Sequence, residues 1–193
     1  EIVLRSVSVL PSETRPILEC LGAVLDEDVV ADMDIPPFDN SAMDGYAVIA
    51  ASTTGATPAN PASLRVIADL PAGYPPPPTV RPGEAVRIMT GAPMPSGCDA
   101  VVRSEYTEKS GDSVRIGRAV SPGEDVRYAG EDVRRGDSVL PRGTLVRPAE
   151  VGMLATLGRT SARVVRTPRV AVLTTGDELV EPDQPMTPGK IRN

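Results

Sequence analysis

Proline and glycine recur along the whole of this 193-residue chain, and the 21 prolines and 17 glycines together make up about one residue in five. Proline removes a backbone hydrogen-bond donor and interrupts helices and central strands, whereas glycine favours tight turns. We therefore expect many short strands joined by turns. Hydrophobic residues make up 40% of the chain, which is ordinary for a globular protein and enough to build a core.

The charged residues and the missing histidine exclude several classes of function. The chain has 20 basic and 26 acidic residues, a net charge of −6, and no lysine or arginine run long enough to follow a phosphate backbone, so nucleic acid is not expected as a partner. Without histidine, imidazole can be neither a general base nor a metal ligand. Acid–base or metal chemistry must use carboxylates, hydroxyls or the two lysines, Lys109 and Lys190.

Cysteine usage and hydropathy indicate a soluble, cytoplasmic protein. Cys20 and Cys98 lie far apart and form no C-x-x-C pair, so we expect two reduced, buried thiols, with a structural or redox pair as the alternative. The sequence shows no signal peptide, no lipidation signal and no stretch of about 18 apolar residues, so no membrane partner is expected.

Hydrophobic spacing predicts a β-rich chain with two helical candidates. Apolar residues within 16–31 fit one face of a helix, although a short helical turn between extended pieces fits nearly as well. A better-marked helix runs from Arg147 to Leu157, with Pro148 at its first position and Gly158 as its stop. Short strands are expected at residues 64–67, 84–89, 100–103, 113–116, 138–140 and 162–165.

The connections complete the coarse picture. Residues 100–103 and 113–116 flank a polar turn at 109–112 and predict a hairpin. Residues 52–63 are expected to be irregular, and residues 71–82 to form a stiff polyproline connector, for which docking of a proline-binding partner is the alternative. Residues 34–129 are therefore expected to form a mostly antiparallel β-domain.

Residues 169–174 differ from all preceding segments because they are almost continuously apolar. This pattern predicts a strand buried on both faces, as at the start of a parallel α/β sheet, with ligand chemistry at its carboxyl end. Only fifteen residues follow Glu178, and they are rich in proline and glycine. They cannot complete such a sheet, so we expect the chain to stop just inside a third region.

One stretch concentrates groups that could carry chemistry. Within residues 36–48, a Pro-Pro entry is followed by Asp39, Asn40, Ser41 and Asp44. The prolines favour an extended approach, the polar side chains bend the backbone locally, and the glycine at position 45 permits a positive φ. The stretch thus predicts an ordered loop with two carboxylates, and the alternative is a turn of purely structural use.

Three further segments place acids or hydroxyls at tight turns: residues 87–98, 130–132 and 172–179. Carboxylates on rigid turns suit Mg²⁺, which takes a few protein oxygens and keeps several waters. The turn Thr90–Gly91–Ala92 is expected to offer backbone N–H groups and a hydroxyl to an oxyanion. Each segment alone is a common turn, and spacing along the chain does not show that they meet in space.

Taken together and in order, these segments resemble the motifs of the MoeA family of molybdopterin molybdenumtransferases, which are related to the gephyrin E domain. The likeness rests on PPFDNSAMDGYAV (36–48), RIMTGAPMPSGCDAVV (87–102), GED (130–132) and RVAVLTTGDEL (169–179). It implies a mixed α and β, β-rich fold. An elongated domain I would be made of two segments, 1–33 and 130–166, with β-domain II, 34–129, inserted between them. Residues 167–193 would begin a truncated α/β domain III.

The resemblance also implies an activity. MoeA proteins are expected to insert molybdate into adenylylated molybdopterin with release of AMP, assisted by Mg²⁺. Family functional positions correspond to Asp44, Thr90, Asp132 and Glu178, with the three acids holding the cation or positioning a phosphate and Thr90 bonding an oxyanion. Asp39, Asn40, Ser41, Gly91 and Asp177 are expected to bind substrate. Which carboxylates bind the metal is left open.

Assembly and the competing hypothesis rest on the same resemblance. The family cleft lies between subunits, so a homodimer is expected, with other proteins of molybdenum cofactor biosynthesis as further candidate partners. Since most of domain III and all of domain IV have no counterpart here, we expect this chain to be inactive by itself. The alternative is a non-catalytic scaffold or dimerisation module of the gephyrin E type.

Overall fold

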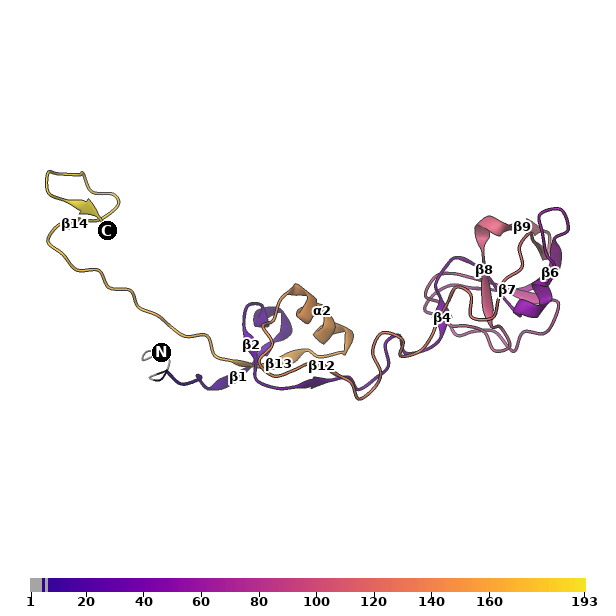
Figure 1. The fold of residues 1–193 in the computed structure, drawn as a ribbon, viewed down its shortest axis with the longest axis horizontal. Helices are drawn as coiled ribbons and strands as arrows, with labels where there is room; N and C mark the ends of the chain where they lie inside the picture. The colour runs from indigo at the N-terminus through magenta and orange to yellow at the C-terminus, as the bar shows by residue number, and fades with distance from the viewer. Residues whose placement is uncertain (1–4, 6) are drawn as a thin grey trace.

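Buried hydrophobic side chains gather in two bodies that are joined by a narrow neck (Figure 1). The computed structural model describes residues 5 and 7–193. One body, which we call the sheet body, is built on a six-stranded sheet; the other, the α2 body, contains helix α2 (Pro148–Thr156). The chain passes from the α2 body to the sheet body and back, and then leaves as a long extended segment (Figure 1).

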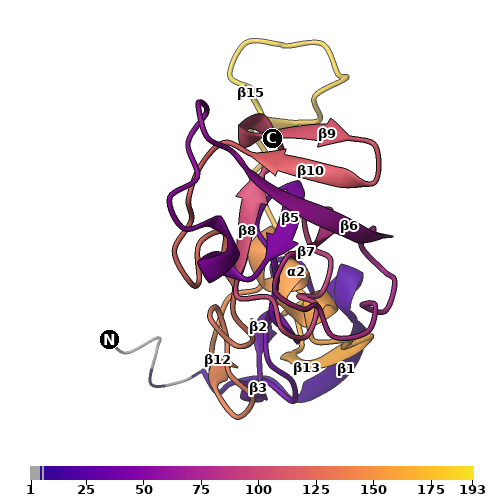
Figure 2. The same cartoon turned by 90° about the vertical axis from the view of Figure 1, so that its right-hand side faces the viewer.

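The sheet body has the strand order β8-β5-β7-β6-β10-β9 (Figure 2). Neighbouring strands are antiparallel except β6 and β7, which are parallel. Residues that alternate along β5 serve opposite faces, so Tyr46 and Val48 pack into one core cluster and Ala47 into another. The strands are β5 (Gly45–Val48), β6 (Ala62–Leu70), β7 (Glu84–Ile88), β8 (Ala100–Arg103), β9 (Thr107–Ser110) and β10 (Ser113–Ile116).

Several loops emerge at the same end of the strands of this sheet. Gly45, at the start of β5, pairs with Ile88 of β7 on one side and Arg103 of β8 on the other, and Leu70 of β6 pairs with Ile88. The loops that precede β5 and follow β6, β7 and β8 therefore all emerge together. We call this the site edge, because three of the four candidate motifs reach it or lie beside it.

The predicted hairpin between residues 100–103 and 113–116 is wrong. Strand β8 pairs with β5, whereas β10 pairs with β9 and with β6. A 3-10 turn, η3 (Ser104–Tyr106), redirects the chain after β8. The hairpin partner β9 has the sequence Thr-Glu-Lys-Ser and is mostly exposed, so it carries no hydrophobic pattern that would mark it as a strand.

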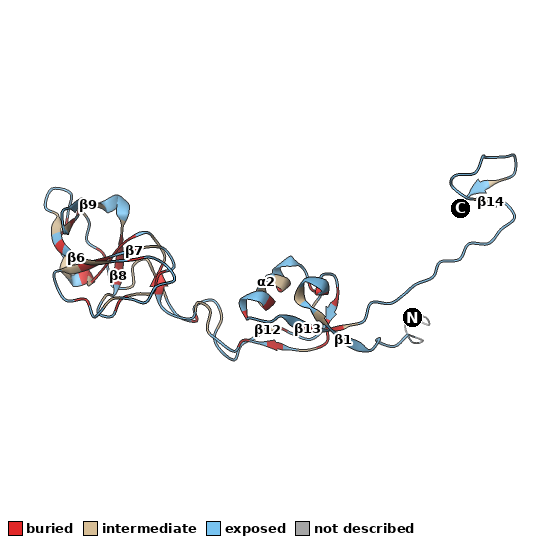
Figure 3. Ribbon diagram, turned by 180° about the vertical axis from the view of Figure 1, so that it is seen from behind, coloured by how far each residue is buried: buried red, intermediate tan, exposed pale blue. Residues whose placement is uncertain are grey.

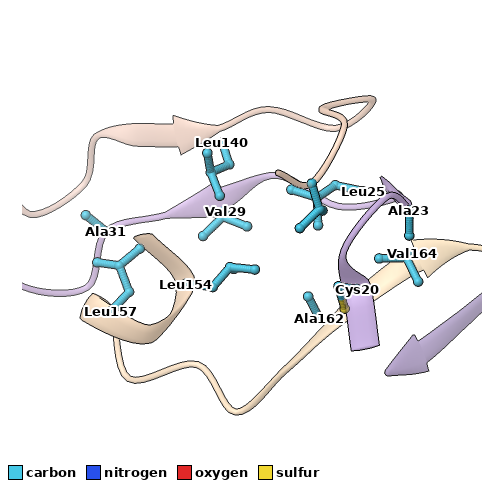
Figure 4. Packing of buried hydrophobic residues seen from close by; sticks show 11 residues of the cluster. Cys20, Ala23, Leu25, Val29, Ala31, Leu140, Leu154, Leu157, Ala162 and Val164 are labelled. Atoms are coloured by element: carbon cyan, nitrogen blue, oxygen red, sulfur yellow. The ribbon is translucent and has the colours of Figure 1, made fainter. Parts of the chain in front are cut away.

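The α2 body draws its core from two distant parts of the chain (Figure 4). Its buried residues fall within 20–31 and 140–164, and Leu154 of α2 lies among them, fully buried. The three-stranded sheet has the order β1-β13-β2, and a separate ribbon pairs β3 with β12. These elements are β1 (Ser12–Pro16), η1 (Ile17–Cys20), β2 (Val24–Leu25), β3 (Val29–Val30), β12 (Ser138–Leu140) and β13 (Ser161–Val165).

Within this body, the helix expected over residues 16–31 is wrong and the alternative is confirmed. The segment forms the short turn η1 between extended pieces, and Leu18 and Leu21 of the supposed apolar face are 79% and 58% exposed. The second helix is confirmed: α2 begins with Pro148, and Gly158 lies just beyond its end with a φ of 69°.

The neck consists of two antiparallel connections that bond to each other (Figure 1). Ala31 donates to the Asp137 carbonyl, Ile35 donates to the Val133 carbonyl, and Gly130 donates to the Pro36 carbonyl. Further along, β4 (Asn40–Ser41) pairs with β11 (Val126–Arg127) where the neck enters the sheet body. The two crossings therefore hold the signature loop 36–44 against residues 126–132.

The strand expected at residues 169–174 is also wrong for this structure. These residues are extended and exposed, with Val170, Val172 and Leu173 at 78%, 84% and 87% exposure (Figure 3). A strand buried on both faces needs neighbouring strands and covering helices, and the described residues place none beside it. The chain then forms a small parallel pair of β14 (Leu179–Val180) and β15 (Ile191–Arg192).

The structure also bears on two smaller expectations. Cys20 and Cys98 are both free, which confirms two unpaired thiols, although Cys98 is only partly buried. Over the described residues, we find no helix that combines the length and the apolar character needed to cross a bilayer. The domain boundaries at residues 33, 129 and 166 stay predictions.

Candidate functional site

The centre of the candidate site is a contact between Asp44 and Thr90. Asp44 precedes β5 and Thr90 follows β7, so both stand at the site edge. Asp44 Oδ1 accepts two hydrogen bonds from Thr90, one from its backbone N–H at 2.7 Å and one from its hydroxyl at 2.8 Å. Two motifs separated by 46 residues are thus joined through one carboxylate oxygen.

These hydrogen bonds keep Asp44 ionised. The backbone N–H of Thr90 and then its hydroxyl lower the pKa of the Asp44 carboxyl, with Arg87 contributing a weaker attraction. The main chain of Asp44 is fixed as well, because its carbonyl accepts from the N–H of Ser104 at 3.0 Å and the hydroxyl of Ser104 at 3.1 Å. Asp44 is therefore a fixed, charged carboxylate.

Gly45 is needed for a different reason from the one predicted. Its φ is not positive, and the residue lies in strand β5. A Cβ at this position would lie 2.0 Å from the Val102 carbonyl oxygen of β8. Only glycine lets the two strands approach this closely, so Gly45 sets the position of Asp44 through packing and not through turn geometry.

The prediction that the turn Thr90–Gly91–Ala92 offers free N–H groups to an oxyanion is wrong. The Thr90 N–H donates to Asp44, the Gly91 N–H to the Ser41 carbonyl, and the Ala92 N–H to the Met89 carbonyl. The Thr90 hydroxyl also uses its single proton on Asp44. Toward a ligand, Asp44 and the Thr90 hydroxyl thus present oxygen lone pairs.

Asn40 and Ser41 support the loop from inside. Ser41 is 0% exposed, and its hydroxyl donates to the Met43 carbonyl at 2.5 Å; Asn40 is 7% exposed and donates to the Phe38 carbonyl at 3.1 Å. Both side chains already have hydrogen-bond partners inside the loop, and substrate binding by these two residues stays a prediction. Substrate binding by Asp39 and Gly91, which are exposed, stays a prediction.

Asp132 reaches the same body through Arg127. The Arg127 guanidinium donates to Asp132 at 2.7 Å and to Glu131 at 2.5 Å, and Arg127 pairs with Asn40 across the β4–β11 ribbon. The third motif therefore lies beside the first, as a clamp of two acids around one arginine. Asp132 is already partly neutralised by this ion pair, whereas Asp44 forms no salt bridge among the described residues.

The arginines that contact acidic residues around the site were not identified from the sequence. Arg103 binds Asp125 through two hydrogen bonds at 2.8 Å and 2.9 Å, and Arg87 lies near enough to Asp44 to influence its charge. A signal existed for both arginines, since Arg87 is the first residue of the second motif and Arg103 follows its last residue directly. Nothing in the sequence linked Asp125 or Arg127 to a partner.

Asp177 and Glu178 do not join the other motifs within one chain. They lie in the exposed C-terminal segment, at the end of the molecule's long axis away from the sheet body (Figure 1). Their hydrogen bonds within the described chain are local ones: the carbonyls of Asp177 and Glu178 accept from Lys190 and Ile191. Their participation in the site stays a prediction that requires a second subunit.

The donor set can be tested against Mg²⁺. No group of three or more acids or thiols within residues 5 and 7–193 is arranged to hold a metal. Mg²⁺, however, is usually bound through one or two carboxylates plus substrate phosphates, with waters in the remaining positions. An ionised Asp44 beside the oxygen of Thr90 fits this mode of Mg²⁺ coordination. The described residues do not form a site in which protein ligands alone would surround the ion.

Comparison with known proteins identifies the chain. Residues 1–158 match the family model described as "MoeA N-terminal region (domain I and II)". The chain belongs to this family. A curated relative, molybdopterin molybdenumtransferase 2 of Mycobacterium tuberculosis, is 48% identical over 92% of this chain, and the Staphylococcus aureus molybdopterin molybdenumtransferase is 38% identical over 99%.

A solved MoeA structure has the same fold. The Pyrococcus horikoshii molybdopterin biosynthesis MoeA protein superposes with a TM-score of 0.83 at 40% identity, and the match covers 91% of this chain and 48% of that protein. The curated relatives named above are covered over 44% and 46% of their lengths. The chain therefore spans about half the length of the MoeA proteins it matches, and the β-rich fold with helix α2 is that of their N-terminal half.

Proposed function

We propose that this chain supplies one wall of the substrate site of a molybdopterin molybdenumtransferase, which inserts molybdate into adenylylated molybdopterin and releases AMP. The relatives carry this name, and the role in molybdenum cofactor biosynthesis follows from family membership. The observation that carries the proposal for this chain is the contact between Asp44 and Thr90, which fixes an ionised carboxylate where the first and second family motifs meet.

The hydrogen bonds define what each residue does. Because Asp44 and Thr90 present oxygens and no free protons, they suit a cation that in turn binds a phosphate, and they do not suit a phosphate directly. We propose that Asp44 holds Mg²⁺ and that Thr90 positions Asp44. When bound, Mg²⁺ neutralises negative charge on the phosphate and molybdate oxygens. Asp132, anchored by Arg127, lies to the side as a second acid.

We propose a homodimer because the fourth motif is separated from the first three within a chain. Asp177 and Glu178 are exposed, and their side chains have no hydrogen-bond partner among the described residues, so a second subunit is needed to bring them to the site edge. A non-catalytic scaffold of the gephyrin E type is the alternative. It requires neither an ionised Asp44 nor Mg²⁺.

The test uses titration calorimetry of the chain with AMP, in the presence and absence of Mg²⁺. The proposal predicts binding that requires Mg²⁺ and that Asp44→Ala abolishes, while Asp112→Ala, a change at an exposed acid on the β9–β10 turn, leaves it intact. AMP binding that does not depend on Mg²⁺ and that persists in the Asp44→Ala variant contradicts the role assigned to Asp44. Binding of a protein partner without any Mg²⁺ dependence would favour the scaffold.

A further inference from the structure

A pocket of about 330 Å³ lies beside the signature loop, and its lining includes Asp39 but not Asp44. It opens between the loop after β7 and the segment that leads into β11. Its walls include Asp39, Asp99, Met94, Cys98, Val126 and Tyr128. The volume falls in the range of roughly 300–1,000 Å³ that is typical of small-molecule sites, and the Asp44–Thr90 site does not use it.

The walls combine apolar side chains and the ring of Tyr128 with two acids. Met94 and Val126 are apolar, and Tyr128 is 51% exposed and leans over the 121–124 turn, where a Cβ on Gly123 would lie 2.7 Å from the Tyr128 hydroxyl. Burial raises the pKa of the Cys98 thiol to about 12, so this side chain is a neutral wall at pH 7. Such a surface suits a planar ring.

The acids select the kind of ring. Asp99 Oδ1 accepts from the Ala50 N–H at 2.6 Å, and Asp39 Oδ1 accepts from the Ala129 N–H at 2.8 Å, so both carboxylates are oriented by the backbone. In the described hydrogen bonds Asp39 uses one acceptor site of Oδ1, which leaves the second site of Oδ1 and both sites of Oδ2 for a ligand. No lysine or arginine is among the described residues that line the pocket, so an anionic group is disfavoured there.

We propose that this pocket binds the pterin ring of the substrate through its 2-amino-4-oxopyrimidine edge. That edge carries two adjacent donors, the ring N3–H and the exocyclic amine, and a carboxylate accepts such a pair side by side. Adenine fits less well because its edge alternates a donor with an acceptor. The ring would lie against Tyr128 while Asp39 accepts its two donors.

The position of the pocket agrees with pterin binding. This inference rests on the proposed function. The Asp39 carbonyl accepts from the Met94 N–H at 2.9 Å, so the first and second motifs form the pocket rim together and then run on to Asp44 and Thr90. A pterin held here would leave its anionic substituents outside the acidic pocket, beside the two motifs that continue to Asp44 and Thr90.

The experiment is a titration of pterin fluorescence with the chain, using pterin itself as the probe and adenosine as a competitor. The wild type is expected to bind, and an excess of adenosine is not expected to displace the pterin. Asp39→Asn retains an acceptor for Ala129 but replaces the second oxygen with a donor, so affinity should fall by roughly tenfold or more. Tyr128→Leu should lower affinity by about fivefold or more through lost stacking.

Two controls separate this proposal from the proposed function. Asp112→Asn is a matched change outside the pocket and should leave pterin affinity unchanged. Asp44→Ala should also leave it unchanged, although it abolishes Mg²⁺-dependent AMP binding. Loss of pterin binding in Asp39→Asn but not in Asp44→Ala supports pterin binding in this pocket. Equal pterin affinity in the wild type and Asp39→Asn, or no pterin binding by the wild type, overturns the proposal, independently of the result for AMP binding.

A second measurement does not depend on any variant. Cys98 lines the pocket, whereas Cys20 is 0% exposed in the α2 body, and the chain has no other cysteine. Bound pterin should slow alkylation of Cys98 and leave that of Cys20 unchanged, as read by peptide mass spectrometry. Unchanged alkylation of Cys98 at saturating pterin contradicts the assignment.

Discussion

Asp125 holds Arg103 through two parallel hydrogen bonds while its own backbone adopts a φ of 55°, the one positive value among the described residues other than glycine. Its carbonyl accepts from the N–H of Ala42 at 2.9 Å. A left-handed conformation costs a residue with a Cβ about 1–2 kcal/mol, so it persists only where surrounding contacts require it. Here those contacts fix the loop just before Asp44.

This relationship predicts a graded loss of stability. Asp125→Asn keeps a side chain that tolerates the left-handed region but removes the charge, and should lower Tm by roughly 2–8 °C. Asp125→Ala should lower it further, since alanine both loses the ion pair and resists this conformation. Thermal unfolding monitored by circular dichroism measures both. If alanine is as stable as the wild type, the Arg103–Asp125 pair does not hold the loop.

Alanine substitutions at two glycines should change the stability of the protein in opposite directions. Gly45→Ala places a methyl group 2.0 Å from the Val102 carbonyl oxygen, so the β5–β8 pairing must shift, at a cost of about 1–3 kcal/mol or more. Gly152→Ala lies within α2 with no atom within 4 Å of the new Cβ, and should stabilise by about 0.5–1 kcal/mol. Urea unfolding of the two variants checks both signs, and a neutral Gly45→Ala would contradict the close approach.

The hydrogen bonds from Thr90 should be detectable in the pKa of the Asp44 carboxyl. Its pKa is lowered first by the Thr90 N–H and then by the Thr90 hydroxyl. Thr90→Val removes only the hydroxyl, so the pKa should rise and still lie below the ordinary value of Asp, while Thr90→Ser should leave it low. Carboxyl NMR titration measures the shift. The stability linked to this pair is present above the ordinary Asp pKa and is lost as pH falls through the lowered one.

The start of α2 gives a second pH dependence. The Arg147 guanidinium and N–H both bond Glu150, and lower the pKa of its carboxyl to about 2. Because the folded pKa lies below the ordinary Glu value, this contribution to stability is complete above about pH 4.5 and is lost as pH falls toward about 2. Glu150→Gln should flatten the acid limb of the stability curve. An unchanged acid limb would show that the pair contributes nothing.

Local chemistry explains which elements the sequence could predict. Helix α2 has Pro148 at its start and Gly158 after its end, and strands β7, β12 and β13 have apolar patterns, so their prediction needed no tertiary information. Strand β9 was missed because it is polar, and the helix at 16–31 was wrong because its apolar residues do not face one core. Periodicity cannot tell which apolar residues will be covered.

The candidate site shows a sharper limit. The motifs located Asp44 and Thr90, but they could not show that the Thr90 N–H and hydroxyl both bond Asp44, nor that the turn therefore lacks free donors. The buried state of Ser41 was equally hidden, because a polar residue in a polar stretch looks exposed. Those properties depend on pairings between parts of the chain that lie far apart in sequence.

The most direct test of the role of Asp44 is the rate of molybdenum insertion by the native protein carrying Asp44→Asn, measured with Mg²⁺ against Asp112→Asn as the matched control. Removing the charge from a carboxylate that holds the cation should lower the rate by about a hundredfold or more while circular dichroism is unchanged. The Asp112→Asn protein should insert molybdenum normally. An Asp44→Asn rate within about twofold of the wild type would contradict the central claim.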